Sequence, residues 1–287
     1  MNVLVVGGTR FFGIPMVKKL ISDGHTITIA SRGQHSDPFG SSAERIIMDK
    51  TDENSVKSAL CGRHFDCVID KVAYCSNDVR SLLKHTRCER YIQMSSCAVY
   101  QSAHTDIAES EFCAKNYPLS WIDRPNDYAL GKRLAERAAF EFMDEKSCVF
   151  VRYPVVMGEN DYTGRLRFYV RSVCSGEPMM INNPDAKTSY IHEKQAGEFI
   201  AHLVAKEFCG AINGCSKGTV SQSEIISCTE KLSGKQAVIA QDGEKAPYDD
   251  TACDTSYKLS KAETLGFAFS DISSWLYDLI AKEINDQ

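Results

Sequence analysis

Residues 2–13 of the chain read Asn2-Val-Leu-Val-Val6-Gly7-Gly-Thr-Arg10-Phe-Phe-Gly13, and residues 14–22 follow with apolar side chains at helical spacing. The apolar run predicts a buried strand, and the glycines predict a tight turn that leads into a helix. Such a turn binds phosphate, because the first N–H groups of a helix have no partner within it and attract an anion. The stretch therefore predicts a dinucleotide site, with Arg10 where the middle glycine of a Gly-x-x-Gly-x-x-Gly spacing would fall.

The composition is that of an ordinary globular protein. The chain has 287 residues, of which 43% are hydrophobic and 25% charged, and its net charge is −5. This length suffices for one domain with a subsidiary lobe or for two small domains. The acidic balance argues against a dedicated nucleic-acid or membrane-surface binder. No apolar run approaches the roughly 20 residues of a membrane helix. A strand that begins at residue 2 leaves no room for a signal peptide, so we expect a cytoplasmic protein.

Twelve cysteines invite a metal or disulfide interpretation. They form no Cys-x-x-Cys pair, however, and have no histidine at zinc-finger spacing. Several lie among apolar residues, such as Cys67 and Cys148. A free cysteine in such a place acts as a small buried hydrophobic residue. We therefore expect reduced thiols and no metal site.

The first half of the chain alternates between two patterns. Apolar runs predict strands over residues 3–6, 26–30, 45–48, 67–69, 91–94 and 149–153. Helical patterns lie between several of them, over residues 14–22, 53–60, 78–84 and 126–143. Strand–helix alternation at this spacing predicts an α/β fold with a doubly wound parallel sheet of the Rossmann type.

The pattern changes after Pro154. Helices are expected over residues 165–175, 192–207, 221–232 and 272–284, with one short strand within 177–184. We expect a nucleotide-binding domain formed by residues 1–154 and 187–213, and a smaller C-terminal substrate lobe formed by residues 155–186 and 214–287. This lobe would lie over the carboxyl edge of the sheet, where open α/β sheets bind their ligands.

Three residues carry the predicted chemistry. Ser96 follows the strand predicted over 91–94, and Tyr128 and Lys132 lie four residues apart on one face of a predicted helix. A phenol has a pKa of about 10 and is a poor acid or base at neutral pH. A nearby ammonium favours the phenolate and lowers that pKa. The serine hydroxyl would donate to the substrate oxygen while a nicotinamide gives or takes the hydride.

With these motifs the chain resembles the extended, epimerase/dehydratase-like branch of the short-chain dehydrogenase/reductase superfamily over nearly its whole length. Ser96 lies in a Ser-x-x-Val-Tyr pattern, and Tyr128 and Lys132 lie in a Tyr-x-x-x-Lys pattern. The resemblance implies that these three residues are catalytic. It also implies a cofactor site formed by Gly7, Thr9, Arg10, Phe11, Phe12, Gly13, Ser31, Arg32, Asp49, Lys50, Ala73, Tyr128, Lys132 and Pro154. An alternative for Asp49 is that it caps the helix predicted over 53–60.

The end of the second predicted strand bears on the choice of dinucleotide. NAD-binding relatives carry an acidic residue at the position of Ser31, where it holds the ribose 2′-hydroxyl. Here no carboxylate repels a 2′-phosphate, and Arg32 can pair with one, helped by Arg10 in the adjacent turn. We predict a preference for NADP(H). NAD(H) remains the alternative if both arginines are only solvated.

A second departure from the family pattern lies at Cys97 and Ala98. The family's sugar 4,6-dehydratases carry an acidic pair there, which performs the elimination. Cysteine and alanine cannot do so, which leaves epimerisation, carbonyl reduction or alcohol oxidation. We expect hydride transfer at a secondary alcohol or ketone of a sugar-nucleotide-like or small carbonyl substrate. Its candidate contacts are Cys97, Tyr162, Arg165 and Arg167, although arginines at helical spacing also suit a solvated helix face.

The expected partner is the small-molecule substrate, with neither nucleic acid nor membrane. By the resemblance, a homodimer would form through the helices that follow the fourth and fifth strands, of which 126–143 is one. The alternative to an enzyme is a non-catalytic or RNA-associated protein, because the Gly-Gly-Thr-Arg-Phe turn also resembles that of the chloroplast stem-loop-binding proteins. The Ser-Tyr-Lys set and the acidic balance count against this alternative.

Overall fold

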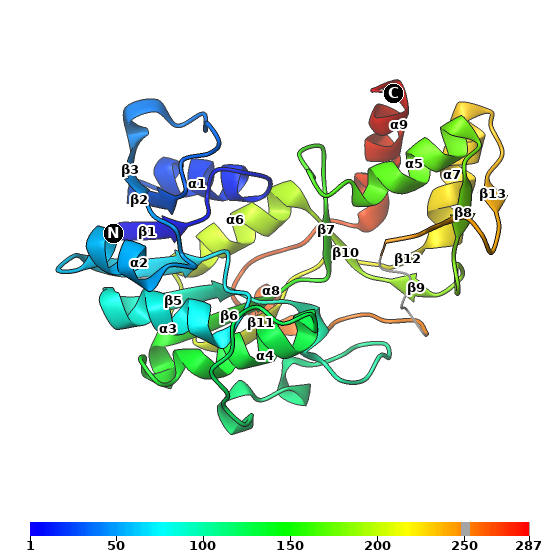
Figure 1. Cartoon of the computed structure of the whole chain (residues 1–287). Helices are drawn as coiled ribbons and strands as arrows, with labels where there is room; N and C mark the ends of the chain where they lie inside the picture. The colour runs from blue at the N-terminus through cyan, green and yellow to red at the C-terminus, as the bar shows by residue number, and fades with distance from the viewer. Residues whose placement is uncertain (248–252, 287) are drawn as a thin grey trace.

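A parallel sheet of seven strands forms the centre of the protein (Figure 1). The computed structural model describes residues 1–247 and 253–286. The strand order is β11-β6-β5-β4-β1-β2-β3, and every neighbouring pair is parallel. The strands are β1 (Asn2–Val6), β2 (Thr26–Ser31), β3 (Ala43–Ile47), β4 (His64–Asp70), β5 (Arg87–Met94), β6 (Cys148–Arg152) and β11 (Gly210–Asn213). The predicted Rossmann-type α/β fold is confirmed.

Helices cover both faces of this sheet (Figure 1). One face carries α1 (Gly13–Ser22) and α6 (Glu193–Val204), and the other carries α2 (Glu53–Leu60), α3 (Ser76–His85) and α4 (Tyr128–Ala139). Strand β1 shows why both faces are apolar, because its side chains alternate. Val3 and Val5 pack in the core with α1 and α6, whereas Leu4 and Val6 pack with α2, α3 and α4.

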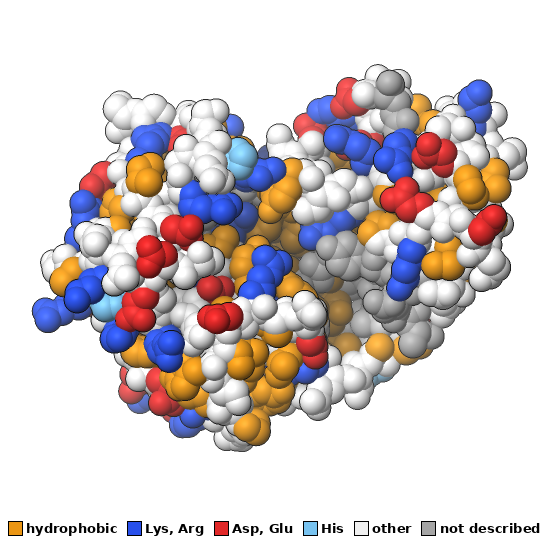
Figure 2. Space-filling model, viewed as in Figure 1, with side chains coloured by type: hydrophobic (Ala, Val, Ile, Leu, Met, Phe, Trp, Pro, Cys, Tyr) orange, Lys and Arg blue, Asp and Glu red, His pale blue; other side chains and the backbone are white. Residues whose placement is uncertain are grey.

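Described residues from the second half of the chain build a second part around its own core. Its main helices are α5 (Arg165–Ser175), α7 (Gln222–Ser233) and α9 (Leu276–Asn285). Short elements complete it or join it to the sheet: β7 (Val155–Met157), β8 (Pro178–Met180), β9 (Lys187–Thr188), β10 (Tyr190–His192), β12 (Val220–Ser221), β13 (Val238–Ile239), β14 (Glu244–Lys245) and α8 (Ser260–Thr264). The surface is hollowed between the two parts (Figure 2). The predicted domain boundaries stay a proposal.

Three predicted helices differ most from the observed ones at their ends. The helix predicted over 126–143 spans only Tyr128–Ala139, because the Asp127 carboxylate accepts from the Leu130 N–H and starts it. After Ala139 the N–H groups of Phe140 and Glu141 bond to carbonyls three residues back, as in a turn. The helix predicted over 192–207 begins after His192, whose ring caps it, and ends at Val204. In the C-terminal tail, Trp275 has non-helical dihedral angles and separates a 3₁₀ turn from α9.

The cysteines are free thiols, and many are buried in the core. Burial raises the pKa of the Cys67 thiol to about 12. Among the described residues, no helix is long and apolar enough to span a bilayer.

The strand order places a crevice at the carboxyl edge of the sheet. Strand β1 has β2 on one side and β4 on the other, so the chain leaves the carboxyl ends of β1 and β4 toward opposite faces. A gap opens between such diverging connections, and open α/β sheets bind ligands there. The candidate site is therefore expected at the residues that follow β1, β2, β3 and β4.

Candidate active site

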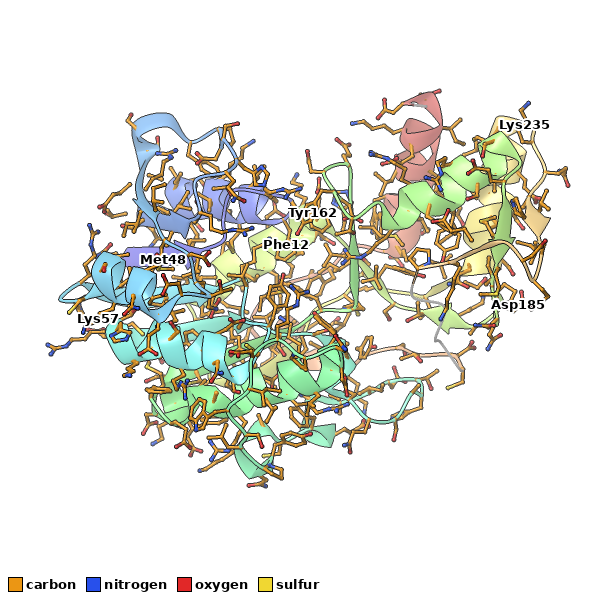
Figure 3. All side chains as sticks on the ribbon, in the orientation of Figure 1. Phe12, Met48, Lys57, Tyr162, Asp185 and Lys235 are labelled. Carbon is orange, nitrogen blue, oxygen red and sulfur yellow. The ribbon has the colours of Figure 1, made fainter. Side chains whose placement is uncertain are left out.

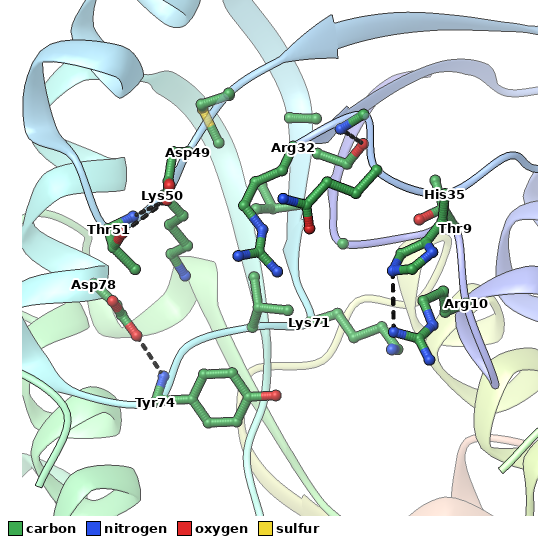
Figure 4. Close-up of a pocket in the computed structure, with 18 of the residues that line it drawn as sticks. Thr9, Arg10, Arg32, His35, Asp49, Lys50, Thr51, Lys71, Tyr74 and Asp78 are labelled. Atoms are coloured by element: carbon green, nitrogen blue, oxygen red, sulfur yellow. Dashed lines mark hydrogen bonds between the residues drawn. The ribbon is translucent and has the colours of Figure 1, made fainter. Parts of the chain in front are cut away.

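A cavity of about 370 Å³ lies at this edge of the sheet (Figure 4). That volume is within the range of small-molecule sites, roughly 300–1,000 Å³. Of the predicted residues, the cavity is lined by Gly7, Thr9, Arg10, Ser31, Arg32, Asp49, Lys50 and Tyr162. Apolar side chains of Val6, Ala30, Met48 and Val72 add a surface that suits a flat base. The structure thus brings the four strand ends together around one space.

The glycine turn has the geometry that its sequence predicts. Gly7 has a φ of +85°, in the left-handed region that favours glycine. At Gly13 an added Cβ would lie 2.8 Å from the carbonyl oxygen of Gly8, so only glycine allows α1 to start this close to the turn. The rings of Phe11 and Phe12 pack against each other and are buried. These two residues and Gly13 do not line the cavity, and they shape the turn instead.

The cavity carries an excess of positive charge. Arg10, Arg32, Lys71 and Arg124 line it, and none has a carboxylate within salt-bridge distance in the part of the chain that the structure describes. Arg10 instead lies 3.6 Å from the centroid of the Tyr162 ring, and its Nη1 is 3.1 Å from Nε2 of His35. Uncompensated cations beside a helix N-terminus fit a multiply charged anion, such as the phosphates of a dinucleotide.

Lys50 contributes less charge than its sequence position suggests. Its ammonium forms an ion pair with the buried carboxylate of Asp70. The same carboxylate accepts a hydrogen bond of 2.9 Å from the Tyr91 hydroxyl. Lys50 lines the cavity, but its charge is compensated within the protein.

Asp49 lines the cavity and does not cap α2. Its carboxylate accepts from the backbone N–H and the hydroxyl of Thr51, at 2.9 and 2.7 Å. These hydrogen bonds hold the pKa of Asp49 below its usual range. The cap of α2 is Asp52, which accepts from the Asn54 N–H. The capping alternative for Asp49 is therefore wrong, and its role in the cofactor site stays a prediction.

Tyr128 and Lys132 occupy one face of α4, one turn apart. Lys132 is fully buried, and its Nζ donates to the carbonyl oxygens of Ala73 and Met94, at 2.7 and 3.1 Å. Burial lowers the pKa of Lys132 to about 7. Its Nζ lies 5.6 Å from the centroid of the Tyr128 ring, which is 43% exposed. The arrangement gives a solvent-accessible phenol above a buried amine.

Ser96 follows β5, at the sheet edge where β4 also ends. Its Oγ accepts from the Ala98 N–H at 3.1 Å, and the Tyr153 carbonyl accepts from its hydroxyl at a long 3.5 Å. The hydroxyl proton is thus only weakly engaged. The neighbouring thiol of Cys97 is buried and donates to the Arg152 carbonyl. Pro154 lies two residues after the end of β6.

Ser96, Tyr128 and Lys132 do not themselves line the cavity, but Tyr74, which does, lies next to Lys132. The Tyr74 ring lines the cavity, and its centroid is 4.8 Å from Nζ of Lys132. Arg124 lies 4.3 Å from the centroid of the same ring. One ring of the cavity wall therefore lies beside the predicted catalytic lysine.

The structure brings only Tyr162, among the predicted substrate contacts, to the cavity. It lies on a loop of the second part, near Phe12 (Figure 3), and its ring packs on Phe11. Arg167 pairs with Glu283 on α9, at 2.9 Å. Arg165 donates to the carbonyl of Val156 at 3.2 Å. Arg165, Arg167 and Cys97 therefore have protein partners outside the cavity, and their contact with substrate stays a prediction.

Sequence reasoning missed several lining residues, notably His35, Lys71, Tyr74 and Arg124. Lys71 could have been predicted, because it lies two residues after the strand predicted over 67–69. The carboxyl ends of parallel strands share one edge of the sheet, where the site lies. Arg124 lies in an irregular segment without periodicity, so no sequence signal pointed to it.

Gly131 allows α4 to approach this edge, and its replacement is expected to disturb both stability and activity. An added Cβ would lie 2.4 Å from the carbonyl oxygen of Tyr74. Gly131→Ala is expected to lower the free energy of unfolding by about 1–3 kcal/mol, as overpacking does, although alanine favours helices. Urea denaturation measures this. Ser58→Ala on the exposed side of α2 is the control and should not destabilise. An equally stable Gly131→Ala variant would contradict the close approach.

The family of the protein follows from sequence comparison. The model of the NAD dependent epimerase/dehydratase family matches residues 3–84 and 75–213. The chain belongs to this family, which comprises enzymes of the extended short-chain dehydrogenase/reductase type. The predicted family is therefore confirmed.

Solved structures with the same fold include two sugar-nucleotide epimerases. UDP-glucuronic acid 4-epimerase of Bacillus cereus, in complex with NAD, has a TM-score of 0.71 and 18% identity, over 99% of this chain and 96% of that chain. UDP-glucose 4-epimerase of Thermotoga maritima, with UDP-glucose, has a TM-score of 0.74 and 15% identity, over 100% of this chain and 99% of that chain. At these identities the likeness shows the fold.

A curated relative is the chloroplast stem-loop binding protein of 41 kDa b of Arabidopsis thaliana. It is 32% identical over 113 residues, which cover 34% of this chain and 30% of that protein. The match thus spans less than a third of the relative's length.

Proposed function

We propose that the protein is an NAD(P)-dependent oxidoreductase or epimerase that transfers a hydride at a secondary alcohol or ketone. The substrate is a sugar nucleotide or a small carbonyl compound. One observation carries the proposal: Lys132 is fully buried beside Tyr74, which lines the cation-rich cavity, and Tyr128 is one helical turn away. Family membership and the sugar-nucleotide epimerases of the same fold support it.

In this proposal the chain's own residues manage the proton. The dinucleotide, when bound along the cavity, supplies or accepts the hydride. The Tyr128 hydroxyl gives a proton to the reacting oxygen or takes one from it. The Lys132 ammonium stabilises the phenolate and so lowers the pKa of the phenol. The Ser96 hydroxyl, weakly engaged in the free protein, donates to the same oxygen.

A substrate panel tests the reaction class. Sugar-nucleotide ketones and small carbonyl compounds are mixed with NADPH, and the absorbance of the reduced nicotinamide is followed. Consumption of NADPH indicates a reductase. An epimerase shows no net consumption, converts one sugar nucleotide into its epimer and retains its dinucleotide through dialysis. No turnover of either kind over the whole panel would count against the proposal.

The cofactor is proposed to be NADP(H) rather than NAD(H). Arg32 and Arg10 face the cavity without a carboxylate partner among the described residues, and Ser31 offers no negative charge to repel a 2′-phosphate. The UDP-glucuronic acid 4-epimerase of the same fold is in complex with NAD, which supports a nicotinamide cofactor for this protein. The choice between NADP(H) and NAD(H) is made by the following experiment.

Arg32→Ala is expected to weaken NADPH binding about tenfold or more, because charge-assisted hydrogen bonds contribute about 1.5–3 kcal/mol. NADH affinity should change little, since NADH lacks the 2′-phosphate. Fluorescence titration with both dinucleotides measures the ratio. Arg63→Ala removes an arginine that pairs with Glu44 away from the cavity and serves as the control. Equal losses for both dinucleotides would contradict the preference.

A second candidate function is RNA association, which the name of the Arabidopsis relative carries for that protein. Within the described residues, the unpaired cations named above line a cavity, and the chain's net charge is −5. Both features favour a small anionic ligand over a polyanion. A salt-sensitive gel shift with stem-loop RNA at micromolar protein would favour the RNA function instead.

Two further expectations stay predictions. A homodimer would use α3 and α4, where Leu119, Trp121 and Phe142 add apolar surface beside α4. Sedimentation analysis decides the oligomeric state. The second expectation is that the protein is located in the cytoplasm.

A further inference from the structure

Lys71 is a buried lysine at the wall of the cavity. It is the first residue after β4, and 7% of it is exposed. Its ammonium lies 4.1 Å from the centroid of the Phe12 ring and points into the cavity beside Arg10 (Figure 4). Within residues 1–247 and 253–286, no acceptor lies within hydrogen-bond reach of it. Lys50 and Lys132 are also buried, but they have acceptors in Asp70 and in two backbone carbonyls.

This arrangement is costly for the free protein. An ammonium at the wall of a cavity loses part of its hydration, and no protein acceptor among the described residues compensates for that loss. The guanidinium of Arg10 stands nearby and repels it. Burial first and Arg10 second lower the pKa of Lys71 to about 8. Such a cost at a cavity wall is typical of a group whose partner is a ligand.

We propose that Lys71 is a phosphate-binding residue that, together with Arg10, holds the diphosphate of the bound dinucleotide. This inference rests on the proposed function. Lys71 lies outside the glycine motif, and it approaches the N-terminus of α1 through its contact with Phe12. Free N–H groups at that helix end bind the same anion.

The diphosphate position is separate from the one proposed for the 2′-phosphate. Arg32 follows β2, and its positive charge lies near enough to Asp49 to help lower the pKa of the Asp49 carboxyl. Lys71 follows β4 and lies beside Arg10. Two probes can therefore distinguish the two cations. ADP carries a diphosphate and no 2′-phosphate, whereas adenosine 2′-monophosphate carries a 2′-phosphate and no diphosphate.

Calorimetric titration of the full-length protein with both probes tests the inference. Lys71→Met keeps the apolar stem and removes the charge. It is expected to weaken ADP binding about tenfold or more and to leave adenosine 2′-monophosphate binding nearly unchanged. Arg32→Met, the matched control, should show the opposite pattern. Thermal unfolding verifies that both variants fold, and Lys71→Gln replaces Lys71→Met if that variant does not.

A pH series adds a second readout. Below pH 8 the ammonium is present, so ADP binds without proton uptake. Above pH 8 wild-type binding must take up a proton, and the Kd rises by up to about tenfold per pH unit. Lys71→Arg keeps its charge and should lack this rise. The other titratable or charged groups of the cavity are the same in both proteins, so their titration cancels in the comparison. They are Arg10, Arg32, His35, Asp49, Lys50 with its partner Asp70, Tyr74, Asp78, Arg124 and Tyr162.

Two results would overturn the assignment of Lys71. One is an unchanged ADP affinity in a folded Lys71→Met variant, and the other is an equal loss for both probes. A wild-type protein that binds neither ADP nor NADPH would instead contradict the proposed function itself.

Discussion

Replacing Tyr128 by phenylalanine is expected to reduce kcat by about 10²–10⁴-fold, which is the range for loss of a general acid or base. The ring of Tyr128 would remain above Lys132, so packing on α4 should be kept. Only the ionisable hydroxyl is lost, and with it the proton transfer at the reacting oxygen. Steady-state turnover of the best substrate from the panel measures the effect.

The matched control is Tyr277→Phe. Tyr277 is a half-exposed tyrosine on α9, in the second part of the protein. Its substitution should leave kcat unchanged. NADPH affinity should be similar in wild type and in both variants, which separates chemistry from binding. Full activity of Tyr128→Phe would show that the catalytic assignment is wrong.

Replacing Glu136 by leucine is expected to lower the free energy of unfolding by about 3–5 kcal/mol, because it leaves a buried cation unpaired. Glu136 and Arg152 are buried and form two hydrogen bonds, Nε–Oε1 at 3.0 Å and Nη2–Oε2 at 2.7 Å. Glu136 lies one turn after Lys132 on α4 and also accepts from Ser95, the neighbour of Ser96. The pair thus fixes α4 against the end of β5, and its loss should also lower activity.

Two comparison variants sharpen this prediction in urea denaturation. Glu141→Leu removes a carboxylate near the end of the same helix that pairs with Arg137 at the surface, and should cost only about 0.3–0.5 kcal/mol. The double variant Glu136→Leu with Arg152→Met should be more stable than Glu136→Leu alone, because no unpaired charge remains. A Glu136→Leu variant as stable as Glu141→Leu would contradict the account.

The sheet could be predicted from the sequence because its signals are local. Strands buried on both faces are continuous apolar runs, as in residues 3–6, and the glycine turn marks where the first one ends. Helix ends were harder. Whether α4 starts at residue 126 or 128 depends on the hydrogen bond of Asp127, and a periodic pattern does not contain that information. Strands of two residues, such as β9 and β12, are too short to show a period.

The site was predictable where it follows a strand and not where it depends on tertiary contacts. Arg32 and Asp49 were found because they follow predicted strands. By contrast, Arg167 has its partner Glu283 in a distant helix, and no local pattern predicts that pairing. The charge of Lys50 is compensated by Asp70 in the same way. The sequence therefore revealed the cations but not which of them have partners within the protein.

The most direct test of the central claim is a crystal structure of the protein with NADP⁺. We predict that the adenosine lies near Asp49, with the 2′-phosphate at Arg32, the diphosphate at the glycine turn, and the nicotinamide beside Tyr128 and Lys132. Electron density for the dinucleotide outside this cavity, or a nicotinamide remote from Tyr128, would contradict the claim that these residues form one hydride-transfer site.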